Sequence, residues 1–166
     1  MKLKNVIAGL AGLLVFLSLD QLTKYLAVAF LKNQEAFPII KNVFELEYLE
    51  NHGAAFGVLQ NRRILLLLVT VCILAVLAVL YMRIPENKRF FPLRFLAILL
   101  MAGAVGNLLD RMLYGYVIDF FSFKLINFPI FNVADCYVVI AVILAFYFIC
   151  FFYDDKELQF LSKKEK

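Results

Sequence analysis

Charged residues and metal-binding residues are scarce in this chain of 166 residues. Aspartate, glutamate, lysine and arginine make up 18% of it, against roughly 25% in soluble proteins. The single histidine, His52, excludes a site built from several histidines. Cys72, Cys136 and Cys150 lie in apolar runs without a CxxC spacing, so neither a zinc site nor a disulfide framework is expected. We interpret the three cysteines as small packing residues.

Apolar residues are present in large excess. They make up 64% of the chain, compared with roughly 45–50% in soluble domains, and the mean hydropathy is +0.85. A chain of this length has too little interior to hide so much apolar surface from water. The composition therefore argues against a soluble enzyme, a disordered chain or a nucleic-acid-binding module, and we expect the excess to face lipid.

Four segments are long and apolar enough to cross a bilayer as helices, which takes about 20 residues each. Their approximate bounds are 5–30, 64–82, 95–114 and 132–153. The first resembles a signal peptide but lacks a cleavage site of small residues, so we expect a retained helix. Residues 43–48 partly alternate between apolar and polar, which indicates a short strand. The predicted fold is thus a single all-α membrane domain, residues 1–166, with a small β-containing region outside the membrane.

The distribution of lysine and arginine predicts the orientation of this domain. The N-terminus, the loop 83–94 and the tail 154–166 together carry ten of these residues. The loops 31–63 and 115–131 carry five lysine and arginine residues, of which Arg62 and Arg63 directly precede the second span. The positive-inside rule therefore predicts that both termini are cytoplasmic and that the loops 31–63 and 115–131 lie on the outer side.

This topology brings ionisable residues from separate segments to a similar depth near the outer face. The residues concerned are Asp20, Lys24, Asp110, Arg111, Asp119 and Asp135. A charge at the bilayer centre costs about 2.5–3.5 kcal/mol on insertion scales, and such residues usually mark a functional site. We therefore expect a polar site at this end of the helices.

Spacing separates supporting residues from reactive ones. Asp20 and Lys24 are one helical turn apart, which favours a structural ion pair that orients the first helix. Asn107, Asp110 and Arg111 share one face of the third span, and structural support is the simpler interpretation for the two charged ones.

Asp119 and Asp135 differ because neither has a basic residue one helical turn away, and apolar residues flank both. A surrounding of low polarity raises the pKa of a carboxyl group, and a second carboxylate raises it further. Two such acids can share a proton, so that one activates water while the other protonates a carbonyl. A role of Asp135 as the N-cap of the fourth helix is an alternative. A metal site made of Asp110, Asp119 and Asp135 is conceivable, but no ligand spacing supports it.

Five ordered blocks of sequence resemble one family of enzymes. They are Asp20-Gln21-Leu22-Thr23-Lys24, Asn51-His52-Gly53-Ala54-Ala55-Phe56-Gly57, Gly103-Ala104-Val105-Gly106-Asn107-Leu108-Leu109-Asp110-Arg111, Val117-Ile118-Asp119-Phe120 and Phe131-Asn132-Val133-Ala134-Asp135. In order and spacing they resemble the lipoprotein signal peptidases (signal peptidase II), the membrane aspartic peptidases of bacteria. The resemblance covers nearly the whole chain.

The resemblance implies that Asp119 and Asp135 are the catalytic pair, and that Asp20 and Lys24 support the site. It further implies a set of residues that shape the pocket and hold substrate: Asn51, Gly53, Asn107, Asp110, Arg111 and Asn132. The implied reaction cuts a prolipoprotein just before a cysteine that carries a diacylglyceryl group, without a metal or cofactor. We expect a monomer in the bacterial cytoplasmic membrane, in contact with membrane lipid and with no nucleic-acid partner.

Two other functions fit the charges within the spans. A small proton-coupled transporter would relay protons along the carboxylates, although the inner halves of the spans offer no charged residue for such a path. A non-catalytic assembly protein would use the same polar groups only to hold helices together. Cleavage of a lipidated prolipoprotein distinguishes a peptidase from both.

Overall fold

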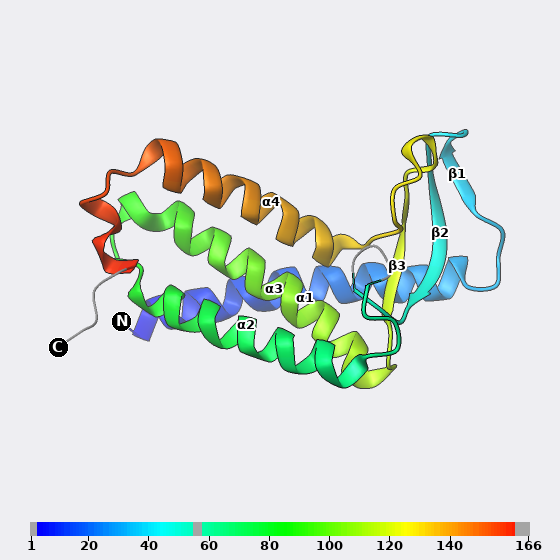
Figure 1. Cartoon of the computed structure of the whole chain (residues 1–166), viewed down its shortest axis with the longest axis horizontal. Helices are drawn as coiled ribbons and strands as arrows, with labels where there is room; N and C mark the ends of the chain where they lie inside the picture. Colours follow the sequence, from blue (N-terminus) through cyan, green and yellow to red (C-terminus); the bar gives the residue numbers. More distant parts are fainter. Residues whose placement is uncertain (1–2, 55–57, 162–166) are drawn as a thin grey trace.

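The computed structural model describes residues 3–54 and 58–161. Its main elements are the helices α1 (Leu3–Leu31), α2 (Arg63–Arg83), α3 (Phe91–Leu113) and α4 (Val133–Tyr147), the last extended by a π-helical turn, η4 (Phe148–Phe152). In the described ranges these are four helices long and apolar enough to cross a membrane, if η4 is counted with α4. They run side by side, with a small sheet at the end opposite the start of α1 (Figure 1). The predicted fold class, a four-helix membrane protein with a small β region, is confirmed.

Helix α3 lies at the centre of the bundle and contacts each of the other three helices. Its buried face carries small residues, among them Ala102, Gly103 and Gly106. A Cβ atom on Gly103 would overlap the carbonyl oxygen of Ala134 in α4, so glycine is what allows these two helices to touch. By contrast, Leu66 is the one buried residue of α2, as expected of a helix that packs against α3 on one side and would face lipid on the others.

The sheet is antiparallel with the order β1-β2-β3, formed by β1 (Phe37–Ile40), β2 (Phe44–Asn51) and β3 (Val117–Ser122). The predicted strand, residues 43–48, falls within β2 except for its first residue, and β2 runs on to Asn51. Neither neighbouring strand was predicted. Most of β3 is buried on both faces, so it shows no alternation of apolar and polar residues. The edge strand β1 is short and contains a proline, which suits an edge but weakens the signal for a strand.

Three short 3-10 helices complete the described chain: η2 (Lys88–Phe90) before α3, η3 (Lys124–Ile126) after β3, and η5 (Glu157–Leu161) after η4. The pairing of β2 with β3 sets Leu49 opposite Asp119 and Asn51 opposite Val117. A backbone pairing between Phe121 and Phe131 then returns the chain from the sheet to the start of α4. The sheet therefore carries Asp119 to the end of the bundle where α4 begins.

Candidate active site

Asp119 lies in β3 with its side chain almost completely buried, at 1% exposure. Two amide groups donate hydrogen bonds to its carboxylate. Asn132 Nδ2 contacts Oδ1 at 2.6 Å, and Asn51 Nδ2, at the end of β2, contacts Oδ2 at 2.8 Å. The sheet thus fixes the carboxylate from one side and the start of α4 fixes it from the other.

Asp135 belongs to the first turn of α4. Its Oδ2 accepts the backbone N–H of Asn132 at 3.2 Å, and Asn132 Oδ1 accepts the backbone N–H of Asp135 at 3.0 Å. These reciprocal bonds form a capping box in which Asn132 is the N-cap. The alternative that Asp135 itself is the N-cap is therefore wrong. The cap lies three residues earlier, which leaves Asp135 Oδ1 to accept a bond from Asn107 Nδ2 at 2.8 Å.

One buried amide connects the two acids. Asn132 binds Asp135 through its backbone N–H and binds Asp119 through its side-chain nitrogen. The same nitrogen donates to Asn107 Oδ1 at 3.1 Å. Because Asn132 is completely buried, its rotamer is fixed, and both carboxylates are held relative to the start of α4.

A buried ion cluster lies beneath these amides. Lys24 Nζ contacts Asp20 Oδ2 at 3.0 Å, Asp110 Oδ2 at 2.9 Å and Asn107 Oδ1 at 2.9 Å, so all three of its N–H groups have acceptors. Asp20 Oδ1 also accepts the backbone N–H of Ala134 in the first turn of α4 at 3.0 Å. Asp20, Lys24 and Asp110 thus link α1, α3 and α4, as expected of supporting residues.

Two further residues complete this cluster. Gly106 was expected from the sequence to allow close packing of helices, whereas Gln21 was given no role. Gln21 donates to Asp110 Oδ1 at 3.0 Å and to Asp20 Oδ2 at 3.2 Å. A Cβ atom on Gly106 would overlap Asp20 Oδ2, so any larger residue there would displace the Asp20 carboxylate from its position in the cluster. The signal for Gln21 was its place inside the first block, beside Asp20.

Arg111 connects the loop after β2 to α3. Its Nη2 donates to the carbonyl oxygen of Gly53 at 2.9 Å, and the N–H of Gly53 donates to Asn51 Oδ1 at 2.9 Å. His52 between them is exposed, with its ring 5.3 Å from that of Tyr116. Ala55, Phe56 and Gly57, the end of the second block, lie outside the described residues.

A cavity of about 810 Å³ opens next to the two acids. Its polar end is formed by Asn51, Asn107, Arg111, Asp119 and Asp135. Its apolar wall comes from residues 128–131 and from α4, where Val139 and Ile140 are also exposed on the outer surface of the bundle. The cavity therefore connects the buried carboxylate of Asp119 and the half-buried carboxylate of Asp135 to the exposed surface of α4.

Comparison with known proteins identifies the family. A family model described as signal peptidase (SPase) II matches residues 12–151. The chain is 42% identical over 134 residues to the lipoprotein signal peptidase of Caldanaerobacter subterraneus subsp. tengcongensis, covering 80% of this chain and 89% of that protein. It is 37% identical over 156 residues to that of Clostridium acetobutylicum, covering 92% and 97%. The chain belongs to the signal peptidase II family.

A solved structure agrees with this assignment. It is described as a bacterial membrane enzyme studied in meso at 2.3 Å resolution, and it is 31% identical to this chain. Its TM-score is 0.74, and the match covers 96% of this chain and 93% of the other. This member of the signal peptidase II family is therefore a multi-pass membrane protein and a peptidase of the aspartic type. The family disfavours the transporter and the assembly protein.

The environment of Asp119 changes its acidity. Burial in an apolar surrounding, and next the negative charge of Asp135, raise the pKa of Asp119 to about 7, although the amides of Asn51 and Asn132 act in the opposite direction. A perturbed carboxyl group beside a second acid in a cavity is typical of acid–base catalysis. The conceivable metal site is not formed among residues 3–54 and 58–161, where Asp110 pairs with Lys24 instead.

The ion cluster gives the first testable prediction for this signal peptidase II family member. Lys24→Met should lower the free energy of unfolding by about 3–5 kcal/mol, because it leaves Asp20 and Asp110 completely buried without a cation. Denaturation in detergent micelles measures the loss. The matched control is Lys32→Met, which breaks an exposed ion pair with Glu50 and should change stability little. Equal effects of the two substitutions would contradict the supporting role of Lys24.

Proposed function

We propose that this member of the signal peptidase II family hydrolyses prolipoproteins with Asp119 and Asp135 as a catalytic pair that shares one proton. The observation that carries the proposal is the position of both carboxylates on one cavity, each bound by Asn132. Two interacting acids lose their protons in separate steps, so one carboxyl and one carboxylate coexist over a range of pH.

In the proposed reaction the carboxylate of the pair removes a proton from a water molecule, whose oxygen attacks the carbon of the scissile carbonyl. The carboxyl group of the pair donates its proton to the carbonyl oxygen, which gives a neutral tetrahedral intermediate. When the intermediate collapses, one acid of the pair donates a proton to the leaving nitrogen and the C–N bond breaks. The other acid takes the proton of one hydroxyl group as the carbonyl re-forms, so the pair again holds one proton. The products are a signal peptide with a new carboxylate and a lipoprotein with a new amino group.

As the specific substrate, we propose a prolipoprotein with a diacylglyceryl group on the cysteine that follows the cleaved bond. Relatives of this chain are named lipoprotein signal peptidases. The shape of the cavity supports a lipidated substrate, because its wall of α4 residues is continuous with the outer surface of the bundle. The acyl chains would stay in the bilayer while the peptide reaches the polar end. Arg111, Asn51 and Asn107, at that end, would hold the peptide backbone.

We place the chain as one membrane domain in the bacterial cytoplasmic membrane, with both termini in the cytoplasm. The excess of lysine and arginine in the N-terminus, loop 83–94 and tail supports this orientation. The sheet would then lie at the outer face, with loops 31–63 and 115–131, at the end opposite the start of α1 (Figure 1). Both acids and the amides of Asn51 and Asn132 that hold them come together within one chain, so the site needs no residue from a second copy, which supports activity as a monomer.

Incubation of the purified protein with matched prolipoproteins, with and without the diacylglyceryl group, tests the proposal. Mass spectrometry should detect two products of the lipidated substrate whose masses together equal the substrate plus one water. The cut should fall directly before the modified cysteine. Equally fast cleavage of the unmodified substrate would contradict the lipid requirement, and a cut at another bond would contradict the proposed substrate position.

The pH dependence of cleavage gives a separate prediction. Since the pKa of Asp119 is raised to about 7, the pair loses its last proton near that pH. The acid that protonates the carbonyl is then lost, so kcat/KM should fall about tenfold per pH unit above roughly pH 7. Initial rates measured from pH 5 to 9 at constant ionic strength test this decrease. A rate that stays constant up to pH 9 would contradict a shared proton.

A further inference from the structure

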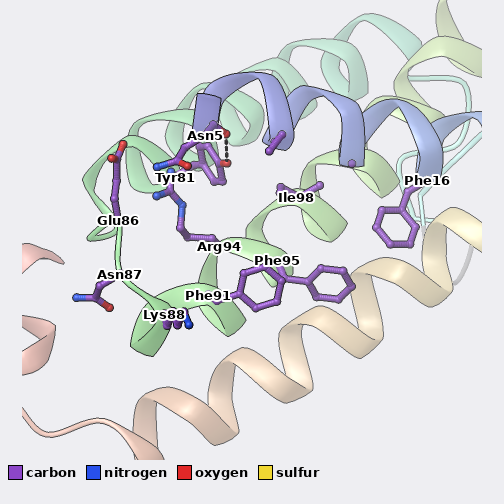
Figure 2. A pocket seen from close by; sticks show the side chains of 13 residues that line it. Asn5, Phe16, Tyr81, Glu86, Asn87, Lys88, Phe91, Arg94, Phe95 and Ile98 are labelled. Atoms are coloured by element: carbon purple, nitrogen blue, oxygen red, sulfur yellow. Dashed lines mark hydrogen bonds between the residues drawn. The ribbon is translucent and has the colours of Figure 1, made fainter. Parts of the chain in front are cut away.

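A second cavity lies at the opposite end of the bundle from the acids, with a volume of about 670 Å³. We call it the α1–α3 groove, because α1 and α3 form its sides and Tyr81 of α2 closes it. Its lining includes Asn5, Gly9, Gly12, Arg94, Phe95 and Ile98. Figure 2 shows the side chains of Asn5, Arg94, Phe95 and Ile98 gathered between the helices. None of them belongs to the candidate active site.

The deeper part of the groove is apolar. The rings of Phe91, Phe95 and Phe16 follow one another along it, with centroid separations of 6.4 Å and 5.7 Å. From Asn5 to Phe16 the groove runs about 16 Å along α1, at the usual rise per residue. This length matches one leaflet of a hydrocarbon core about 30 Å thick. Phe91 is 66% exposed, so the groove opens sideways to the lipid.

The mouth of the groove is polar, and the described residues that line it carry net positive charge. Lys88 and Arg94 supply two positive charges there, and Glu86 supplies one negative charge. Arg94 is buried, extends from α3 towards Asn5, and lies 4.9 Å from the centre of the Tyr81 ring (Figure 2). Lysine and arginine are the usual donors to phosphate oxygens, and basic pockets between membrane helices bind anionic lipid head groups.

We infer that the α1–α3 groove binds a phospholipid with a singly negative head group, taken from the leaflet on this side of the membrane. The phosphodiester sits at Lys88 and Arg94, and one acyl chain lies along the phenylalanine row. The single net positive charge of the described lining residues complements such a head group, whereas a zwitterionic lipid leaves that charge unbalanced. A free phosphate ion would leave the apolar length of the groove unfilled. The bound lipid would contact both α1 and the connection between α2 and α3, and so hold them together.

Titration of the purified full-length protein with phosphatidylglycerol in detergent tests the head group, with native mass spectrometry as the readout. Phosphatidylglycerol should bind at least fivefold more tightly than phosphatidylcholine, the affinity equivalent of one basic charge at a membrane surface. Lys88→Gln should lose about fivefold in affinity, while Lys41→Gln, at an exposed lysine beside the sheet, should lose none. Equal binding of both lipids, or wild-type affinity in Lys88→Gln, would overturn the inference.

A second pair of variants tests the acyl chain. A Cβ atom on Gly12 would meet the Ile98 side chain at an ordinary 3.6 Å, so Gly12→Leu adds a side chain to the groove without a clash with the backbone. It should abolish the increase in melting temperature caused by phosphatidylglycerol. Val15→Leu, on the exposed face of the same helix, should keep that increase. An unchanged increase in Gly12→Leu, or an equal increase with inorganic phosphate, would reject a lipid in the groove.

Discussion

Replacing either Asp119 or Asp135 by asparagine should lower kcat for a lipidated prolipoprotein by about 10⁴-fold or more. The amide keeps the size of the side chain but can neither remove a proton from water nor donate one to the carbonyl. Groups that act as a unit lose most of their rate enhancement when any one member is removed, so the double variant should be scarcely slower than either single variant. Single-turnover cleavage measures the loss without interference from product release.

The matched control is Asp155→Asn, because Asp155 is exposed in the turn after η4 and should not affect cleavage. Stability provides a second control. The pKa of Asp119 is raised by folding, so the folded protein loses stability as the pH rises from the unfolded value of this group to about 7. Asparagine does not ionise, so Asp119→Asn should have a higher melting temperature than wild type at pH 8. An inactive variant with a lower melting temperature than wild type would indicate a folding defect instead. Activity within tenfold of wild type would contradict the catalytic pair.

Asn132→Ser should lower kcat by about 100-fold while leaving the protein folded. Serine caps helices about as well as asparagine, so α4 keeps its start. The serine side chain has no nitrogen that could replace Asn132 Nδ2, which donates to Asp119 Oδ1 at 2.6 Å and to Asn107 Oδ1 at 3.1 Å. Loss of one donor of an oxyanion hole costs about 10²–10³ in kcat, and we expect the lower end of this range for a donor that positions a catalytic acid. Because Asn132 positions the acids, KM should change much less than kcat.

Asn132→Ala separates the two roles of this residue. Alanine removes the cap as well as the bridge, so it should be less stable than the serine variant by about 1 kcal/mol and equally slow. Thermal unfolding and single-turnover rates of both variants provide the comparison. Wild-type kcat in Asn132→Ser would mean that the amide only caps α4 and that the acids hold their positions without it.

The sequence allowed the fold class to be predicted because the physical constraint in a bilayer is simple. A segment of about 20 apolar residues has to be helical there, because its backbone N–H and C=O groups find hydrogen-bond partners only within the segment itself. The same constraint makes each buried charge conspicuous, so Asp20, Lys24 and Asp110 could be assigned to a supporting role from depth and spacing. The structure joins them in one cluster. The assignment of catalysis to Asp119 and Asp135 stays a prediction.

Other features depend on tertiary contacts that no local pattern encodes. The strand β3 is buried by α1 on one side and lies beside β2, so it lacks the alternation by which strands are recognised. The capping residue of α4 is Asn132 rather than Asp135, because the side chain of Asp135 faces back to its own helix start. Asn132 therefore has a second role, as the link between two acids. This role depends on where β3 lies relative to the start of α4. The α1–α3 groove likewise arises from packing alone.

The most direct test of the proposed mechanism is a structure of the protein with a peptide analogue that replaces the scissile carbonyl by a hydroxymethylene group. Such a group mimics the tetrahedral intermediate, so its hydroxyl should lie within hydrogen-bonding distance of both Asp119 and Asp135 at the polar end of the cavity. A hydroxyl that contacts only one of the two carboxyl groups, or an analogue bound elsewhere, would contradict hydrolysis by a shared-proton pair.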